Sequence, residues 1–187
     1  MTLYHYSEDP TIKEFVPRAP LAYPEQEPLV WALDDWHSPL YFVPRDCPRI
    51  CFWPTPTTTL KDREKWFGAT SARMVMAVEW DWFERLQNTK LYRYLLPEES
   101  FEPLNDAGMY ISRTPVTPLG IAPLGDLTRR LRESEVELRL CASLVPLGQS
   151  ITGSSLHYSL IRMRNAAGWP QSEVGKKDDT ATLIKIA

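Results

Sequence analysis

The chain has 187 residues, of which 43% are hydrophobic and 24% are charged, and its formal net charge is -3. This balance is typical of a folded domain, and it argues against a disordered chain and against a general nucleic-acid binder. The length predicts one α+β domain over residues 1–166, followed by a loosely ordered tail over residues 167–187. The 17 prolines disfavour long helices and favour edge strands and irregular connections.

Short apolar runs and helical stripes alternate along the chain, without the regular repeat of a doubly wound parallel sheet. The expected strands cover residues 3–6, 29–33, 50–53, 73–78, 90–96, 108–113, 119–122 and 136–141. The expected helices cover residues 36–42, 61–67, 79–88 and 126–132, with two more between residues 143 and 165 and a last strand at 181–186. The pattern predicts an α+β fold with a bent, mostly antiparallel sheet and peripheral short helices.

The cysteines and histidines do not form a metal-binding pattern. Cys47 and Cys51 have no second pair to complete a zinc site, and a third cysteine lies far away at position 141. The histidines are also widely spaced, so we expect no metal. The N-terminus lacks the regions of a signal peptide, and no apolar run approaches the roughly 20 residues of a membrane span. We expect a cytoplasmic protein with no membrane partner.

His5 is the most informative residue, because it stands inside an aromatic strand. Side chains alternate along a strand, so His5 and Ser7 share one face and Tyr4 and Tyr6 the other. Two interpretations are open. His5 is a core histidine that bonds a backbone carbonyl, or it donates to a sugar hydroxyl in a cleft.

The segment Leu-Tyr-His-Tyr-Ser at residues 3–7 resembles the first strand of the ADP-ribosyltransferase superfamily. In that superfamily the histidine bonds a ribose hydroxyl in the nicotinamide half of NAD. The resemblance implies an ADP-ribosyltransferase-like fold, NAD as the cofactor or another nucleotide as the ligand, and a ribose-binding role for His5. Ser7 or nearby backbone would help to hold the nicotinamide amide.

Residues 30–35 and 40–42 are similar to a second superfamily segment, in which an aromatic ring stacks on nicotinamide. Trp31 and Tyr41 are the candidates for this role, and core packing is an equally open interpretation of each. The resemblance predicts that His5, Trp31 and Tyr110 line one cavity.

Residues 108–119 are similar to a third segment, a strand followed by a Pro-Val turn. Many superfamily members place a catalytic Glu or Gln near the start of this strand, where the present chain has Met109 and Tyr110 instead. Tyr110 becomes the second catalytic candidate beside His5, and Ser112 and Arg113 become candidate ligands of the nucleotide. Transfer to a protein acceptor is in question, which leaves an altered reaction or a binding-only pocket.

Arg45 lies in a proline-bounded turn and is a candidate for a phosphate, because a guanidinium binds oxyanions with two parallel bonds. A structural ion pair with Asp46 is the alternative.

Over nearly its full length the chain also resembles an uncharacterised bacterial family, through the blocks at residues 3–8, 30–32, 44–49 and 161–166. The leading hypothesis is an ADP-ribosyltransferase-like protein that binds NAD or a related nucleotide and cleaves a glycosidic bond. The alternatives are a non-catalytic nucleotide-sensing or interaction domain, and a metal-dependent hydrolase or nuclease of another fold.

Overall fold

The computed structural model describes residues 1–19, 26–104 and 106–170. The chain divides into two compact units that alternate along the sequence. Unit 1 is Met1–Arg45 with Asn88–Leu127, and unit 2 is Asp46–Gln87 with Thr128–Ala187. Each unit has its own sheet and its own hydrophobic cluster, and the expected single domain over residues 1–166 stays a prediction.

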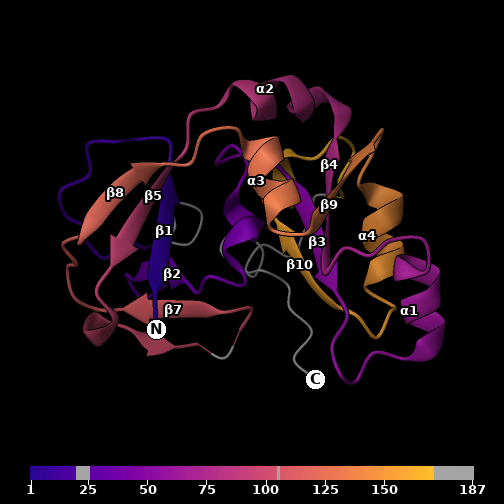
Figure 1. Cartoon of the computed structure of the whole chain (residues 1–187), viewed down its shortest axis with the longest axis horizontal. Helices are drawn as coiled ribbons and strands as arrows, with labels where there is room; N and C mark the ends of the chain where they lie inside the picture. The colour runs from indigo at the N-terminus through magenta and orange to yellow at the C-terminus, as the bar shows by residue number, and fades with distance from the viewer. Residues whose placement is uncertain (20–25, 105, 171–187) are drawn as a thin grey trace. The chain divides into compact units, whose positions relative to one another are not determined.

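Unit 1 is built on a sheet in which β1 lies between β2 and β5, as Figure 1 shows. Its strand order is β6-β7-β2-β1-β5-β8, and the neighbouring strands are antiparallel. The bounds are Leu3–Ser7 for β1, Val30–Leu33 for β2, Tyr92–Leu96 for β5, Glu102–Pro103 for β6, Met109–Ser112 for β7 and Gly120–Pro123 for β8. Two 3-10 helices, η1 at Ser38–Tyr41 and η3 at Glu98–Ser100, follow β2 and β5.

One face of this sheet carries the hydrophobic cluster of unit 1. Its members come from alternate positions of the central strands and from the connecting segments, and they include Leu3, Phe15, Ala32, Tyr94 and Val116. The alternation follows from the two-residue period of a strand. A backbone bridge between Phe15 and Val116 joins two of these connecting segments over the same cluster.

Unit 2 contains a second sheet of order β10-β3-β4-β9. Its strands are β3 at Arg49–Trp53, β4 at Met74–Glu79, β9 at Val136–Cys141 and β10 at His157–Ile161. The pair β4–β9 is parallel and the other pairs are antiparallel. Every residue of β3 and β4 is buried, because both strands are central in the sheet. The buried residues are apolar except for Arg49, which begins β3, and Glu79, which ends β4.

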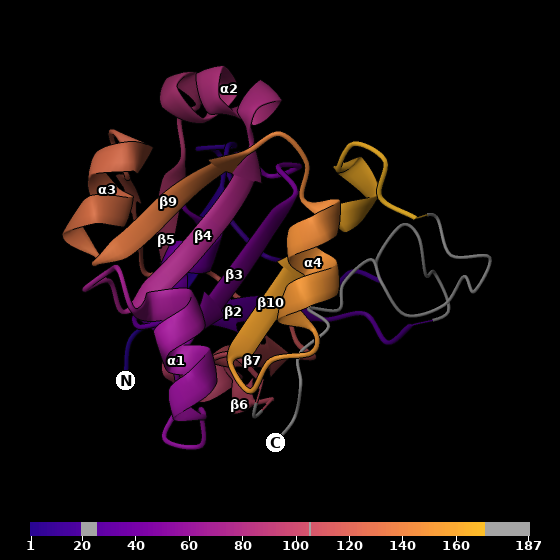
Figure 2. The same ribbon diagram turned by 90° about the vertical axis from the view of Figure 1, so that its right-hand side faces the viewer.

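Helices α1, Leu60–Phe67, and α4, Val145–Ile151, lie on one face of this second sheet, as Figure 2 shows. The core between them includes Phe52, Phe67, Val75 and Ile151. Thr59 caps α1 by accepting a bond from the backbone N–H of Asp62 over 3.2 Å. The remaining helices are α2 at Phe83–Asn88 and α3 at Leu127–Glu133, with 3-10 helices η2 at Trp80–Trp82 and η4 at Met163–Asn165.

The structure confirms the α+β class and the mostly antiparallel pairing. The expected single sheet is wrong, because the strands form two sheets. The segment between residues 143 and 165 was expected to be two helices, but α4 and the short 3-10 helix η4 are separated by His157–Ile161, which pairs with β3 as an edge strand. The strand expected at residues 181–186, like most of the expected tail, lies outside the described residues. Within the described part of the chain, no helix is long and apolar enough to cross a membrane.

Candidate functional site

His5 faces the hydrophobic cluster of unit 1. Its ring lies 4.6 Å from the ring of Phe15, and its Nδ1 atom lies 2.9 Å from the carbonyl oxygen of Trp31. Since a carbonyl only accepts, Nδ1 carries the proton. Burial lowers the pKa of His5, the bond to Trp31 opposes this effect, and the nearby charge of Arg45 adds to it. This geometry fits the core interpretation, while the ribose-binding role stays a prediction.

The strand register separates Trp31 from the other two residues expected in one cavity. Trp31 pairs with Ile111, whereas Tyr110 pairs with Ala32 on the neighbouring rung. β1 pairs with β2 through Tyr4 and Leu33, which puts His5 opposite Ala32. Directly paired residues share a face and successive residues alternate, so Tyr110 shares the face of His5 and Trp31 points to the opposite one. The prediction that these three side chains line one cavity is therefore wrong.

Three other predicted site residues, the ligands Ser7 and Ser112 and the catalytic candidate Tyr110, form hydrogen bonds with other residues of unit 1. The Ser7 hydroxyl accepts from the backbone N–H of Asp9 over 3.1 Å. The Ser112 hydroxyl donates to the carbonyl oxygen of Thr114 over 3.1 Å. Tyr110 donates through its hydroxyl to the sulfur of Met1 over 3.1 Å.

The remaining predicted ligands lie in η1 or in the segments that follow η1 and β7. Tyr41 ends η1 and is half-buried. Arg113 is exposed and forms ion pairs with Glu27 and Glu102, which favours a structural role over phosphate binding. Arg45 is exposed, and it is the one predicted phosphate ligand whose charge acts on His5.

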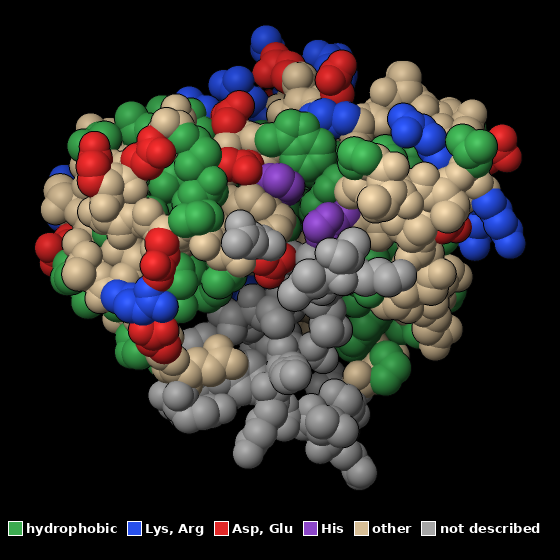
Figure 3. Space-filling view, turned by 90° about the horizontal axis from the view of Figure 1, so that it is seen from below, with side chains coloured by type: hydrophobic (Ala, Val, Ile, Leu, Met, Phe, Trp, Pro, Cys, Tyr) green, Lys and Arg blue, Asp and Glu red, His purple; other side chains and the backbone are tan. Residues whose placement is uncertain are grey.

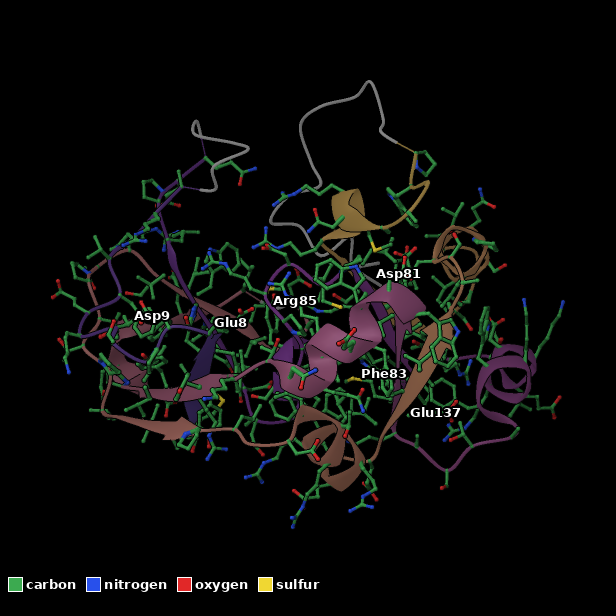
Figure 4. All side chains as sticks on the ribbon, turned by 90° about the horizontal axis from the view of Figure 1, so that it is seen from above. Glu8, Asp9, Asp81, Phe83, Arg85 and Glu137 are labelled. Atoms are coloured by element: carbon green, nitrogen blue, oxygen red, sulfur yellow. The ribbon has the colours of Figure 1, made fainter. Side chains whose placement is uncertain are left out.

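The turn after β1 holds Arg45 in place through a carboxylate. Glu8 accepts from the backbone N–H of Arg45 over 2.8 Å. Its neighbour Asp9 accepts from the backbone N–H of Thr11 over 2.8 Å, an ordinary turn bond. Figure 4 shows Glu8 and Asp9 side by side where β1 ends.

A different constellation forms where β2 ends. The Nδ1 atom of His37 lies 2.9 Å from Oδ1 and 3.0 Å from Oδ2 of Asp34. The same carboxylate accepts from the backbone N–H of His37 over 2.7 Å. The Asp34 side chain therefore stabilises the turn that follows β2. Because an ionised carboxylate only accepts, Nδ1 of His37 carries the proton, and Nε2 is the basic nitrogen of the neutral ring.

Gly108 makes room for this pair. The backbone N–H of Asp34 donates to the carbonyl oxygen of Gly108 over 2.9 Å. A Cβ atom at position 108 would overlap His37 Nδ1 and Asp34 Oδ2. Gly108 also has a φ of 66°, which lies in the left-handed region that favours glycine.

A second carboxyl group, Asp106, lies two residues before Gly108. Burial raises the pKa of Asp106 to about 6, and the charge of His37 acts in the opposite direction. Its Oδ1 atom is buried and has no hydrogen-bond donor among the described residues. The carbonyl oxygen of Asp106 accepts from the backbone N–H of Met109 over 2.8 Å, which fixes the turn into β7.

We call Asp34, His37 and Asp106 the acid–base cluster. The His37 side chain is 19% exposed, and Figure 3 shows histidine side chains at the molecular surface with acidic side chains nearby. Trp36 lies beside the cluster, with its ring edge-on to that of His37 at 4.6 Å and 40% of its surface exposed.

The sequence analysis missed this cluster. The local signal was Asp34 and His37 three positions apart at the end of an apolar strand. Asp106 and Gly108 join them only through the pairing of β2 with β7. Among the described residues, no group of three or more His, Cys, Asp or Glu side chains is arranged to hold a metal ion. The expected independence from metals stays a prediction.

Comparison with known proteins places the chain in a family. Residues 4–166 match the model of a family of unknown function, DUF6886. No curated protein and no solved structure matches the chain. The family match includes most of the residues on which the resemblance to an uncharacterised family rested, and it confirms that resemblance. Since it spans far more than half of the sequence, the chain belongs to the DUF6886 family of unknown function.

Proposed function

We propose that the chain is an enzyme that moves protons at the acid–base cluster of unit 1. The observation that carries the proposal is the double contact of His37 Nδ1 with both oxygens of Asp34. A carboxylate that holds one imidazole nitrogen sets the tautomer and stabilises the charged ring when the other nitrogen takes a proton. Catalytic histidines in many hydrolases and transferases are oriented in this way.

Asp106 supplies the second titrating group that such a mechanism needs. A carboxyl group with a pKa of about 6 is populated both as acid and as base near neutral pH. His37 is the proposed general base, Asp34 its positioning residue, and Asp106 the proposed acid. The reaction class that fits is hydrolysis or group transfer with protonation of a leaving group.

A screen of hydrolase and transferase substrates tests the proposal. The panel contains NAD, nucleosides, glycosides, esters and phosphoesters, and each activity is compared between the wild type, His37→Gln and Asp106→Asn. Loss of general acid–base catalysis lowers the rate by about 100- to 10,000-fold, so both variants should be nearly inactive. His157→Gln is the control, since His157 stacks on Trp53 in unit 2. An activity that persists in both cluster variants would overturn the proposal.

Nucleotide binding is the second candidate function, and the proximity of Arg45 to His5 favours it. We propose that an ADP-ribosyltransferase-like site would use Arg45 for a phosphate and NAD as the ligand, in a cytoplasmic protein whose three cysteines are free thiols. At 100 times its dissociation constant, NAD would stabilise the fold by about 2.7 kcal/mol. A thermal-shift titration with NAD, ADP-ribose and AMP measures this effect, and Arg45→Gln should reduce it.

Release of nicotinamide separates the two forms of this second candidate. Binding with release supports a transferase or glycosidic-bond cleavage. Binding without release supports a non-catalytic sensor. An unchanged melting temperature with all three nucleotides would refute the second candidate in both forms.

A further inference from the structure

Residues 106–109 form the turn that leads into β7, and we call them the β7 turn. The backbone N–H of Met109 donates to the carbonyl oxygen of Asp106 over 2.8 Å. Both central residues lie in the left-handed region, with a φ of 41° at Ala107 and of 66° at Gly108. A glycine adopts this conformation readily but an alanine does not, so the closed turn holds backbone strain at Ala107.

Two further hydrogen bonds and local packing hold this strained turn in place. The backbone N–H of Leu104 donates to the carbonyl oxygen of Met109, and that of Asp34 donates to the carbonyl oxygen of Gly108, each over 2.9 Å. Ala107 is 5% exposed. A turn that is closed by a few local contacts opens at a lower free energy than the whole fold, so one group of the turn can shift its opening.

The negative charge of Asp106 opposes the closed form of the β7 turn. Its Oδ1 atom is buried and meets no hydrogen-bond donor in residues 1–19, 26–104 and 106–170. A buried oxygen of this kind costs more free energy when the carboxyl group is ionised than when it is protonated. Opening of the turn supplies water as the donor and also releases the strain at Ala107.

The proton of Asp106 is therefore linked to closure of the turn. Burial raises the pKa of Asp106 from 3.8 to about 6. The charged groups around the turn are Asp34 and His37, which follow β2, and Glu102 on β6, which pairs with Arg113. The charge of His37 opposes the effect of burial and is the smaller of the two. Since the closed turn holds the proton more tightly than a hydrated carboxyl group does, closure becomes less favourable as the pH rises from 3.8 to about 6.

We propose that the β7 turn is a pH-dependent switch for the acid–base cluster, closed while Asp106 is protonated and shifted towards an open form when Asp106 ionises. This inference concerns the regulation of that cluster, and its catalytic consequence rests on the proposed function. In the closed form, the protonated Asp106 is available as the acid. In the open form, its carboxylate is hydrated and displaced from the cluster.

Amide hydrogen exchange of the full chain, followed by NMR, measures the opening. Protection factors remove the intrinsic effect of pH on exchange. The amides of Met109 and Asp34 have their acceptors in the β7 turn, and they should lose about tenfold of their protection between pH 5 and pH 7.5. The amide of Leu124, which donates to the carbonyl oxygen of Leu91 in the same unit, is the internal reference.

Variants assign the response to its cause. Asp106→Asn should remove the loss of protection, because the side chain no longer titrates. Asp35→Asn, at an exposed position in the segment after β2, is the matched control and should respond as the wild type does. His37→Gln should also keep the response. Ala107→Gly should raise the protection of Met109 by about threefold at both pH values, since glycine relieves the strain.

Two outcomes would overturn the inference. One is protection of Met109 and Asp34 that changes with pH no more than that of Leu124, and the other is a loss of protection that Asp106→Asn leaves unchanged. The substrate screen is independent of this measurement. If protection does not respond to pH while both cluster variants lose an activity, the switch fails and the acid–base function stands. If protection responds through Asp106 but the activity persists in both variants, the acid–base function fails.

Discussion

The backbone N–H of Asp34 donates to the carbonyl oxygen of Gly108 over 2.9 Å, one step beyond the last paired residues of β2 and β7. This bond continues the antiparallel ladder past both strand ends. It places the carboxylate of Asp34 over a position that has no side chain. The cluster therefore depends on a glycine that the chemistry of the site does not itself use.

Gly108→Ala should destabilise the protein by roughly 3 kcal/mol, as the sum of left-handed backbone strain and overlap with Asp34 and His37. Gly125→Ala is the matched control. Gly125 has a φ of 78°, but a Cβ atom there would meet nothing within 4 Å. We expect the control to cost about 1 kcal/mol, the strain alone. Urea denaturation of both variants measures the difference, and equal losses would show that the cluster tolerates a side chain at position 108.

Asp106→Asn should raise the melting temperature at pH 7.5 and leave it nearly unchanged at pH 4. The folded-state pKa of Asp106 is about 6, above the unfolded value of 3.8. The folded state therefore holds more protons between these values, and the carboxyl group lowers stability as the pH rises through this window. Asparagine removes the charge and keeps the shape. Thermal melts from pH 4 to 8 test the sign, and a variant less stable than the wild type at pH 7.5 would contradict it.

His5→Gln should reduce the loss of stability on acidification. Burial lowers the folded-state pKa of His5 below its ordinary value of 6.5. The unfolded state then takes up the proton first, so stability falls as the pH drops below about 6.5 towards the folded pKa. Glutamine still offers an N–H to the carbonyl oxygen of Trp31, but it does not titrate.

The measurement for His5 is the change in melting temperature between pH 7 and pH 5. Tyr110→Phe is the control, because its position on the same face of the sheet does not involve a histidine. An identical acid response in His5→Gln and in the wild type would show that His5 gains no proton on unfolding in this range.

Most of the strands were predictable, because their apolar residues alternate or run together over short distances. The strand β10 was not, since residues 157–161 follow a Pro- and Gly-interrupted helix and pair with β3, far earlier in the chain. Local sequence patterns do not predict the pairing of strands that lie far apart in the chain. The division into two sheets was missed for the same reason.

The residues of the candidate site were even harder to predict from the local sequence, because they come from distant segments. Asp34 and His37 are close in the sequence, between a strand expected to end at residue 33 and a helix expected to begin at residue 36. Asp106 and Gly108 reach them through the register of β2 with β7, and a shift of one residue would have exchanged the faces of Trp31 and its neighbours. The resemblance to a known pocket strand identified the residues of β1 but could not show which partners face them.

The fourth prediction concerns Glu79, which ends β4 and is 4% exposed. Its carboxylate accepts from the backbone N–H of Leu144 over 3.3 Å and, through both oxygens, from that of Ala167 over 3.1 Å. Leu144 is the N-cap of α4, so one carboxylate joins the start of this helix to the segment after η4. Glu79→Ala leaves two backbone N–H groups without an acceptor and opens a cavity, and we expect a loss of about 2–4 kcal/mol in unfolding free energy.

A second variant, Glu79→Gln, separates the hydrogen bonds of Glu79 from its bulk, and Asp81→Ala serves as the control. Glu79→Gln keeps the shape and one acceptor oxygen, so it should cost about 1 kcal/mol. Asp81→Ala, at an exposed position two residues later, should change the free energy of unfolding by less than about 0.5 kcal/mol. Urea denaturation gives all three values on one scale. If Glu79→Gln were as damaging as Glu79→Ala, the negative charge would be what this position requires, because the side-chain volume is the same in the glutamine variant as in the wild type.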